Sequence, residues 1–464
     1  MSHALEITAA TVDPAILDLP WEIPLEDWPA DILAALPRGL SRHVVRFVHL
    51  SERVIAVKEI GETVAHKEYE LLRDLSRLEA PSVLPTAVIT GRSTPRGHEL
   101  AAVLITEHLQ FSLPYRALFS KHMTPETATR LIDALAVLLV RLHLLGFYWG
   151  DVSLSNTLFR RDAGSFSAYL VDAETGELHP EGLTDGQRAY DVDLARTNII
   201  GELMDLQAGS YFPGEEDPIE VGDRIRTRYN ELWYELTAKE SIALDQRWKV
   251  QERIERLNDL GFDVGELQMS SDRAGSHLVI QPKVVDAGHH HRRLMRLTGL
   301  DVEEKQAQRM LNDLETYRAV TGKSNRPVEL VAHEWVHEVY EPVISAIPPE
   351  LATKLDPGQI FHEFLEHRWF CAQNAGHDLP QDEVIASYVE SVLPTKRDEA
   401  LLLDPGMADT AEMMAVNSIE SEPIDGMLGH ADPDADPDAG SWAEDAPAPT
   451  MRFVPGLGLI PVYD

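Results

Sequence analysis

The residues best suited to chemistry are two carboxylates and an amide in the first half of the chain. Asp151 is followed by Asn156 five residues later, and Asp172 ends the next strand-like run. Alone, each would be an ordinary turn residue. Together, after a long helix, they form the set that Mg²⁺-dependent phosphoryl transfer needs. We predict that Asp151 is the base for an attacking hydroxyl and that Asn156 and Asp172 are the metal ligands.

A lysine and a glutamate upstream extend this set. The run "VIAVKEI" places Lys58 inside an alternating, strand-like stretch where a charge is notable, and Glu68 lies on the helix expected next. An ion pair between them would orient the ammonium toward the α- and β-phosphates of a nucleotide. Lys58 and Glu68 are therefore the predicted nucleotide-binding residues.

A second group of residues indicates zinc chemistry instead. His333, Glu334 and His337 form an H-E-x-x-H pattern, in which two imidazoles one helical turn apart could bind Zn²⁺ with the glutamate as general base. A catalytic site needs a third ligand. The candidates for it are His362, Glu363, Glu366 and His367. Packing of the aliphatic and aromatic residues on the same helix is the competing explanation.

A basic patch, His289 to Arg293, has two interpretations. It is either the solvated start of a helix or an anion site for phosphate or substrate. The pattern alone does not separate them.

Charge limits the partners of the chain. It carries 41 basic and 77 acidic residues among 464, a formal net charge of -36. Such a charge repels nucleic acid and anionic lipid surfaces at long range. We expect no nucleic-acid partner.

The N-terminus and the single cysteine indicate a cytoplasmic protein. The first 28 residues lack the basic and apolar regions of a signal peptide, and Cys371 has no intrachain partner for a disulfide. The most apolar stretch, around 131–147, is shorter than a membrane span and contains Asp133 and Arg141, so we predict a buried helix and no membrane insertion.

The elements that must position these residues follow from periodicity. Strand patterns with one inserted helix predict an antiparallel sheet over 40–107. A long helix is expected over 124–145, with Thr124 as its N-cap. The pattern over 218–400 predicts a mostly helical region, with a hairpin turning at 273–275.

Composition predicts four segments. They are an N-terminal extension (1–39), an α+β domain (40–215), a mostly helical domain (216–400) and an acidic, disordered tail (401–464).

The ordered set resembles the protein-kinase-like superfamily. Residues 55–58 correspond to its V-A-I-K motif, and 148–156, "YWGDVSLSN", to its catalytic loop. Gly before Asp is closer to the aminoglycoside-phosphotransferase and lipopolysaccharide-kinase branches. "YDVDLAR", 190–196, resembles the helix that braces the catalytic loop in those families. The second half resembles an uncharacterised bacterial helical domain that follows a lipopolysaccharide-kinase-like domain. The resemblance implies an antiparallel N-lobe and a helical C-lobe.

Three departures keep a pseudokinase interpretation open. Ala173 replaces the Phe expected after the metal-binding Asp, and the catalytic-loop His is absent. The segment before residue 43 contains only Gly39, so the G-x-G-x-x-G loop that covers the phosphates is not visible.

The leading hypothesis is a phosphotransferase of kinase-like fold that uses ATP and Mg²⁺. The acceptor hydroxyl stays open between a protein, a sugar and a small metabolite. A pseudokinase-type binding protein, with a protein partner on the helical domain or the acidic tail, is the alternative. A zinc metallopeptidase built on His333, Glu334 and His337 is the third hypothesis.

Overall fold

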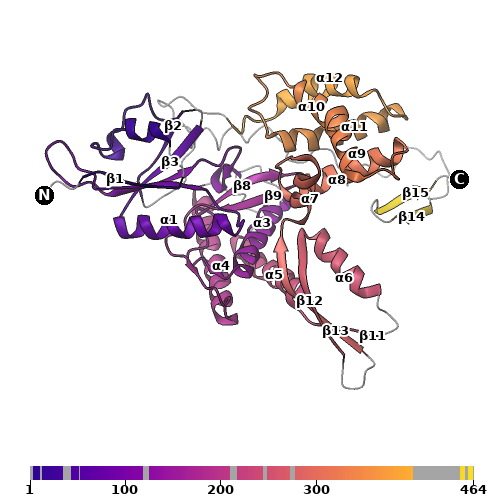
Figure 1. Cartoon of the computed structure of the whole chain (residues 1–464), viewed down its shortest axis with the longest axis horizontal. Helices are drawn as coiled ribbons and strands as arrows, with labels where there is room; N and C mark the ends of the chain where they lie inside the picture. The colour runs from indigo at the N-terminus through magenta and orange to yellow at the C-terminus, as the bar shows by residue number, and fades with distance from the viewer. Residues whose placement is uncertain are drawn as a thin grey trace.

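The structure, a computed structural model, describes most of the chain (Figure 1). The described residues are 4–10, 13–34, 43–51, 53–118, 125–209, 217–243, 248–271, 277–400, 450–454 and 458–462. Several predicted features lie outside them, namely the glycine-poor segment around Gly39, the Thr124 cap, the turn at 273–275 and most of the tail.

A five-stranded antiparallel sheet forms the N-terminal lobe, with the order β1-β4-β5-β3-β2. Its strands are β1 (Glu6–Ala9), β2 (Val45–Leu50), β3 (Arg53–Ile60), β4 (Pro85–Thr90) and β5 (Ala102–Glu107). Helix α1 (Glu62–Arg77) covers one face. The β2–β3 hairpin pairs Leu50 with Arg53.

The N-terminal segment covers the other face of this sheet. Two short 3₁₀ helices, η1 (Pro14–Asp18) and η2 (Leu25–Asp27), lead Trp21 and Trp28 into a buried cluster with the sheet. The two indoles meet edge to face at 5.2 Å. The outer face of the sheet is therefore shielded from water by the chain's own N-terminus.

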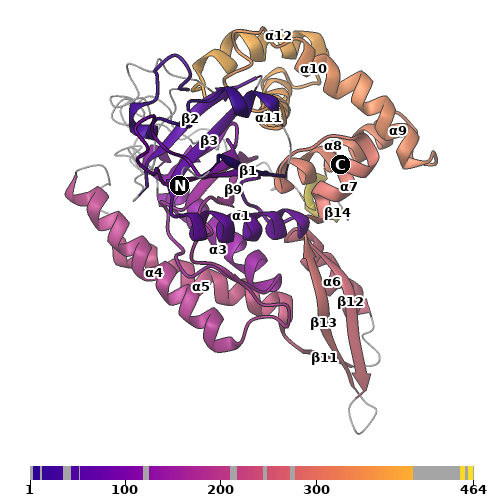
Figure 2. The ribbon, with the colours of Figure 1, turned by 60° about the vertical axis from the view of Figure 1, so that its left-hand side comes forward.

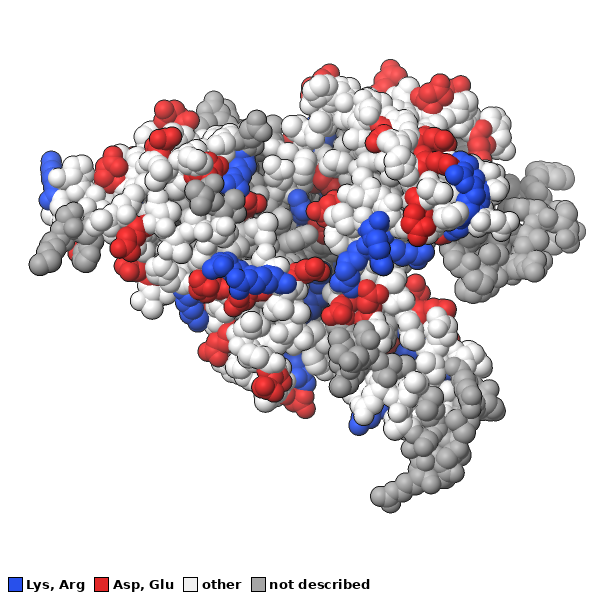
Figure 3. Space-filling view, viewed as in Figure 1, with Lys and Arg blue, Asp and Glu red and all other residues white. Residues whose placement is uncertain are grey.

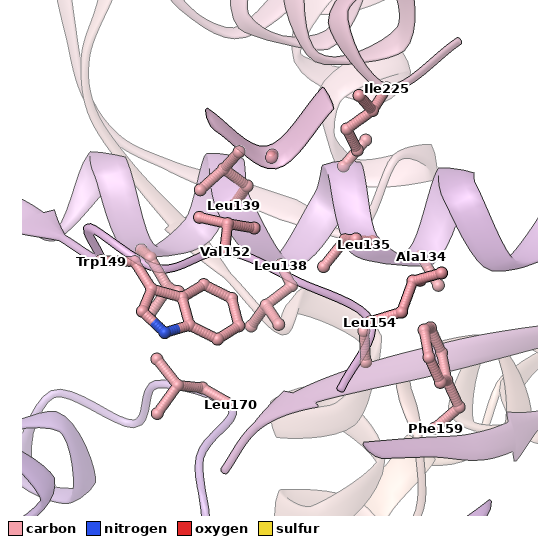
Figure 4. Close-up of a cluster of buried hydrophobic side chains, with 14 of the residues drawn as sticks. Ala134, Leu135, Leu138, Leu139, Trp149, Val152, Leu154, Phe159, Leu170 and Ile225 are labelled. Atoms are coloured by element: carbon pink, nitrogen blue, oxygen red, sulfur yellow. The ribbon is translucent and has the colours of Figure 1, made fainter. Parts of the chain in front are cut away.

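The second lobe is built around α3 (Pro125–Leu144), which starts with proline at its first position and buries an almost continuous apolar surface. The other elements of this lobe are β6 (Leu113–Pro114), α2 (Tyr115–Leu118), β7 (Phe147–Tyr148), β8 (Thr157–Asp162), β9 (Ser165–Leu170), β10 (Glu177–Leu178), α4 (Asp185–Ala208) and α5 (Pro218–Thr237). Figure 4 shows how leucines of α3 pack against Trp149, Val152 and Leu154 of the following loop. The loop that carries Asp151 thus rests on the most buried helix of the lobe.

No helix in the described part of the chain is long and apolar enough to cross a membrane. The apolar stretch that we expected to be buried is α3 itself, whose Leu131, Leu135, Leu138 and Leu142 are all buried.

A projecting sheet joins the second lobe to the helical domain. Strands β11 (Glu240–Ala243), β12 (Phe262–Ser271) and β13 (His277–Ala287) pair antiparallel, and α6 (Trp248–Asp259) packs on β12. Both ribbon views show this hairpin extending away from the body (Figures 1 and 2).

The helical domain has its own hydrophobic core, centred on Trp335, Phe361 and Phe364. Its elements are α7 (His289–Thr298), α8 (Glu304–Val320), α9 (Val328–Trp335), the π-helical turn η4 (Val336–Tyr340), α10 (Glu341–Ser345), α11 (Pro357–Ala375), α12 (Gln381–Ser391) and η5 (Leu393–Thr395). Farther along, β14 (Thr450–Val454) and β15 (Gly458–Val462) form an antiparallel pair.

Apolar residues of α5, such as Val221 and Ile225, belong to the core cluster of the first domain. The boundary near residue 215 stays a prediction.

Candidate active site

Lys58, Glu68 and Asp172 meet although they lie on three separate elements. Alternation along β3 turns Val57 toward the N-terminal cover and Lys58 toward the face that carries α1. Lys58 Nζ donates to Glu68 Oε2 at 3.1 Å and to Asp172 Oδ2 at 2.8 Å. The side chain of Glu68 is only 1% exposed. The charged side chain of Lys58 is thus paired with two carboxylates from other elements.

Burial and charge shape the titration of this group. Burial raises the pKa of Glu68 to about 7, with the nearby Asp172 adding to the effect and Lys58 opposing it. Burial would lower the pKa of Lys58, but the carboxylates of Glu68 and Asp172 raise it above the ordinary lysine value. Lys58 is therefore a charged ammonium held between carboxylates.

Glu174 is a site residue that the sequence reasoning missed. Its Oε2 lies 3.8 Å from Lys58 Nζ and 3.2 Å from His43 Nε2. Among the described residues, Glu68, Asp172 and Glu174 are the only group whose ligand atoms could share a metal ion, all within 4.8 Å of one another. In the sequence, the signal for Glu174 was its position two residues after Asp172. In the structure, the backbone N–H of Glu174 donates to Asp172 Oδ1 at 3.1 Å.

Asp151 and Asn156 are joined within one loop. Asn156 Nδ2 donates to the Asp151 carbonyl at 3.0 Å and to Asp151 Oδ2 at 3.1 Å. The amide nitrogen is thus committed to Asp151, and the amide oxygen is the Asn156 atom suited to a metal.

Helix α4 braces this loop through buried carboxylates. Asp191 accepts from the backbone N–H of Trp149 and of Gly150, both at 2.9 Å, and lies 3.1 Å from His143 Nε2. Glu202 accepts from the N–H of Leu154 at 2.8 Å, and burial raises the pKa of its carboxyl.

The brace is longer than the motif indicated. Asp191 lies in the predicted segment "YDVDLAR", but Asn198 and Glu202 lie beyond it on the same face of α4. Asn198 Nδ2 donates to the carbonyl of Val152 at 3.0 Å. The spacing i, i+7, i+11 from Asp191 was a signal for both residues.

Trp149 connects the loop to the Asp172 segment. Its indole Nε1 donates to the Asp172 carbonyl at 2.9 Å, and Thr175 Oγ1 donates to the Trp149 carbonyl at 2.8 Å. Gly150, next to it, has φ 77°, and a Cβ there would approach the Tyr148 ring to 3.0 Å. This explains why glycine precedes Asp151. All five predicted site residues therefore belong to one connected assembly.

The H-E-x-x-H residues do not form a comparable assembly. His333 and His337 are both exposed, with ring centroids 4.4 Å apart. Glu334, the proposed base, pairs with Lys323 at 2.9 Å and with Arg326 at 2.7 Å.

No third ligand joins these histidines among the described residues. The candidates are engaged elsewhere, with Glu363 near Lys396, Glu366 near His362 and His367 near Ser387. The peptidase hypothesis thus has no metal site in the described part of the chain. Packing of Trp335 and Val339 into the core of the helical domain accounts for this helix.

The basic patch at the start of α7 is largely neutralised by the fold. His289 and Arg292 pair with Asp263, and His290 Nδ1 lies 2.8 Å from Glu304 Oε1. The backbone N–H groups of His290 and His291 also donate to Glu304, at 2.8 and 3.0 Å. The backbone N–H groups at the start of α7 therefore already bind a carboxylate and are not free to bind another anion.

Two family models match parts of the chain. Residues 45–198 match the model of the lipopolysaccharide kinase (Kdo/WaaP) family, and residues 231–393 match a domain of unknown function, DUF4032. Among solved structures, the chain is similar to "WaaP in complex with acyl carrier protein", with 14% identity, a TM-score of 0.33, and coverage of 55% of this chain and 98% of that chain. None of the curated proteins matches.

The fold and the matched family together define the class: a two-lobed, α+β, protein-kinase-like domain. More particularly, the kinase-like part matches the lipopolysaccharide kinase (Kdo/WaaP) family model over residues 45–198, and the mostly helical part that follows matches a domain of unknown function. The predicted resemblance and the predicted fold class are confirmed.

Proposed function

We propose that the chain is a phosphotransferase that moves the γ-phosphate of ATP, with Mg²⁺, to a hydroxyl acceptor. The observation that carries the proposal is the contact of Lys58 Nζ with both Glu68 and Asp172, linked through Trp149 to the loop of Asp151 and Asn156. Kinase-like catalysis requires this combination of a phosphate-orienting lysine, a base and metal ligands.

The charges of the site fit a divalent cation. Three carboxylates, those of Glu68, Asp172 and Glu174, surround the single ammonium of Lys58. Asp172 and the amide oxygen of Asn156 would hold Mg²⁺, which supplies neutralisation of the phosphate charge when it is bound. Glu174 adds a further carboxylate beside them.

The roles of the chain's own residues then follow. Lys58, oriented by Glu68, binds the α- and β-phosphates. Asp151 orients the acceptor hydroxyl and takes its proton as the oxygen attacks phosphorus. Asp191 and Glu202 position that base by holding the backbone of its loop. The acceptor stays open between a protein, a sugar and a small metabolite, and the net charge of -36 disfavours an anionic lipid.

A binding protein without catalysis is the second candidate. One observation in its favour is Ala173, which stands where the kinase family has Phe after the metal-binding Asp. Another is the contact at 2.8 Å between Lys58 and Asp172, because the ammonium already binds the carboxylate that we propose as a metal ligand.

Transfer of label from γ-³²P-ATP distinguishes the two candidates. The assay would offer the chain itself, a generic protein and a panel of sugars as acceptors, with Asp151→Asn as the inactive control. Transfer or ATP hydrolysis by wild type that falls on the order of 10²–10⁴-fold in Asp151→Asn supports the enzyme. Nucleotide binding with equal, background turnover in both proteins supports the binding module.

A further inference from the structure

A cavity of about 1110 Å³ lies between the kinase-like domain and the helical domain. Its walls come from the end of α1, from α3 and from β8–β9 on one side, and from α7, α8 and the start of α11 on the other. Figure 3 shows Lys and Arg side chains gathered over α7, beside the hollow between the two domains. None of Lys58, Asp151, Asn156 and Asp172 lines it, so it is separate from the candidate active site.

Arg141 is one of the cations that line this cavity. It occupies the last turn of α3, and its guanidinium donates only a long hydrogen bond, 3.5 Å, to the carbonyl of Glu79. No carboxylate of the described residues lies within ion-pair distance of it. The C-terminal carbonyls of α3 offset part of the cost of enclosing this cation. Burial nevertheless lowers the pKa of Arg141 from its usual value, which reflects that cost.

Five acidic residues line the cavity, and none makes an ion pair with Arg141. Two of them are exposed and lie near other cations of the lining, Glu79 at 3.9 Å from Arg292 and Asp301 at 3.8 Å from His291 Nδ1. Glu303 accepts from Tyr169 Oη at 2.6 Å and lies 3.3 Å from Arg160. Glu304 caps the start of α7, and Asp356 accepts from the N–H of Gln359 at the start of α11. Glu304 and Glu303 favour the charge of Arg141 from a distance, but its guanidinium makes no ion pair with them.

Four more basic residues line the cavity: Arg160 and Arg292, which pair with Glu303 and Asp263, and Arg296 and His291. Arg296, on the exposed face of α7, has no carboxylate within ion-pair distance among the described residues. His291 Nδ1 donates to the carbonyl of Val302 at 2.8 Å, so its Nε2 donates to a phosphate oxygen when the ring is protonated. Guanidinium groups suit phosphate oxygens because they donate two parallel hydrogen bonds.

Apolar side chains complete the lining. Leu84, Phe111, Met295 and Leu300 offer contact surface beyond the basic groups. A site with polar groups at a few points and apolar walls suits an organic ligand rather than a bare ion.

We infer that this cavity binds a small phosphorylated organic molecule, with Arg141, Arg296 and His291 on its phosphate and the apolar walls around its body. The ligand would contact both domains at once, next to the β8–β9 hairpin that separates Asn156 from Asp172. The inference does not depend on the proposed catalysis.

Phenyl phosphate is a suitable probe, because it combines a phosphomonoester with an apolar ring. Titration calorimetry on the full chain would measure its binding to wild type, Arg141→Gln and Arg296→Gln, with phenol as the uncharged control ligand. Arg130→Gln is the matched control, since it lies three turns earlier on α3 and pairs only distantly, at 4.0 Å, with Glu126. We expect phenyl phosphate to bind wild type and Arg130→Gln equally, and each cavity variant about ten-fold or more weakly.

Two further measurements test whether the phosphate binds in this cavity and whether Arg141 lacks an ion-pair partner there. Lys58→Met should bind phenyl phosphate as wild type does, and the melting temperature of unliganded Arg141→Gln should not fall, because the substitution removes a partly buried charge that has no ion-pair partner. Absence of binding to wild type at millimolar concentrations would overturn the inference. So would unchanged affinity in both cavity variants, or loss of binding in Lys58→Met, which would place the phosphate at the nucleotide site.

Discussion

At the scale of single residues, the geometry of the candidate site depends on carboxylates that serve the backbone rather than the chemistry. Asp191 is fully buried and satisfies two backbone N–H groups and one imidazole. Its lone pairs replace the water that these donors would otherwise bind. Loss of such an acceptor leaves buried donors unpaired, which costs more than the hydrogen bond itself contributes.

We predict that Asp191→Asn destabilises the chain by about 1–3 kcal/mol, because an amide NH₂ would face backbone or imidazole donors in place of an oxygen. Urea unfolding measures this loss. Asp193→Asn, at an exposed position two residues along the same helix, is the control and should stay within about 0.5 kcal/mol of wild type. Equal stability of the two variants would show that Asp191 does not hold the loop.

At the scale of elements, the β8–β9 hairpin connects the loop of Asp151 and Asn156 to the helical domain. Asp162, at the end of β8, accepts from the N–H groups of Lys305 and Gln306 at the start of α8, both at 2.8 Å. A residue of one domain thus caps a helix of the other. The strand that follows Asn156 is thereby attached to the neighbouring domain.

This cap predicts a pH dependence of stability. Burial, with the nearby Glu303, raises the pKa of Asp162 to about 7 from an unfolded value of 3.8. The folded state therefore holds a proton that the unfolded state releases between these values, so this group lowers stability as pH rises from about 4 through 7.

Asp162→Asn keeps the acceptor oxygen and removes the titration. Its loss of melting temperature between pH 5 and pH 8 should be smaller than that of wild type. Asp205→Asn, an exposed site on α4, should behave as wild type does. Parallel melting curves for wild type and Asp162→Asn across this range would contradict the assignment.

At the scale of the whole molecule, an ion pair links β8 of the kinase-like domain to the end of the helical domain. Arg161 Nε lies 2.6 Å from Glu399 Oε1, whose side chain is 1% exposed. Removing one partner of such a pair leaves a buried charge behind. The attachment joins the kinase-like β8 to the segment after α12.

Arg161→Met should therefore lower the free energy of unfolding by about 3 kcal/mol. The control is Arg77→Met, which removes a surface pair with Asp74 and should cost under about 1 kcal/mol. Chemical denaturation followed by tryptophan fluorescence would measure both. A cost for Arg161→Met no larger than that for Arg77→Met would mean that the pair does not stabilise the attachment.

The sequence predicted the features of this protein that depend on the order of motifs and on local hydrophobic patterns. Lys58, Glu68 and Asp172 were found because strand alternation and motif order are local signals, and α3 because its apolar run and its start signal are strong. Glu174 was missed because its role depends on tertiary contacts of its side chain with Lys58 on β3 and with His43.

Arg141 shows the limit of sequence reasoning most clearly. In the sequence it merely interrupts an apolar run, and only the packing of a second domain against α3 places it in a cavity. The spacing of His333 and His337 did not identify a metal site, for a related reason. Helical spacing supplies two ligands, but a third depends on tertiary structure.

The most direct test of the central claim is thermal stabilisation by ATP with Mg²⁺, compared between wild type and Asp172→Asn. If Lys58, Glu68 and Asp172 form a nucleotide site, the melting temperature of wild type rises with ATP concentration, and Asp172→Asn loses most of this rise. Absence of any nucleotide-dependent rise in wild type would contradict the account.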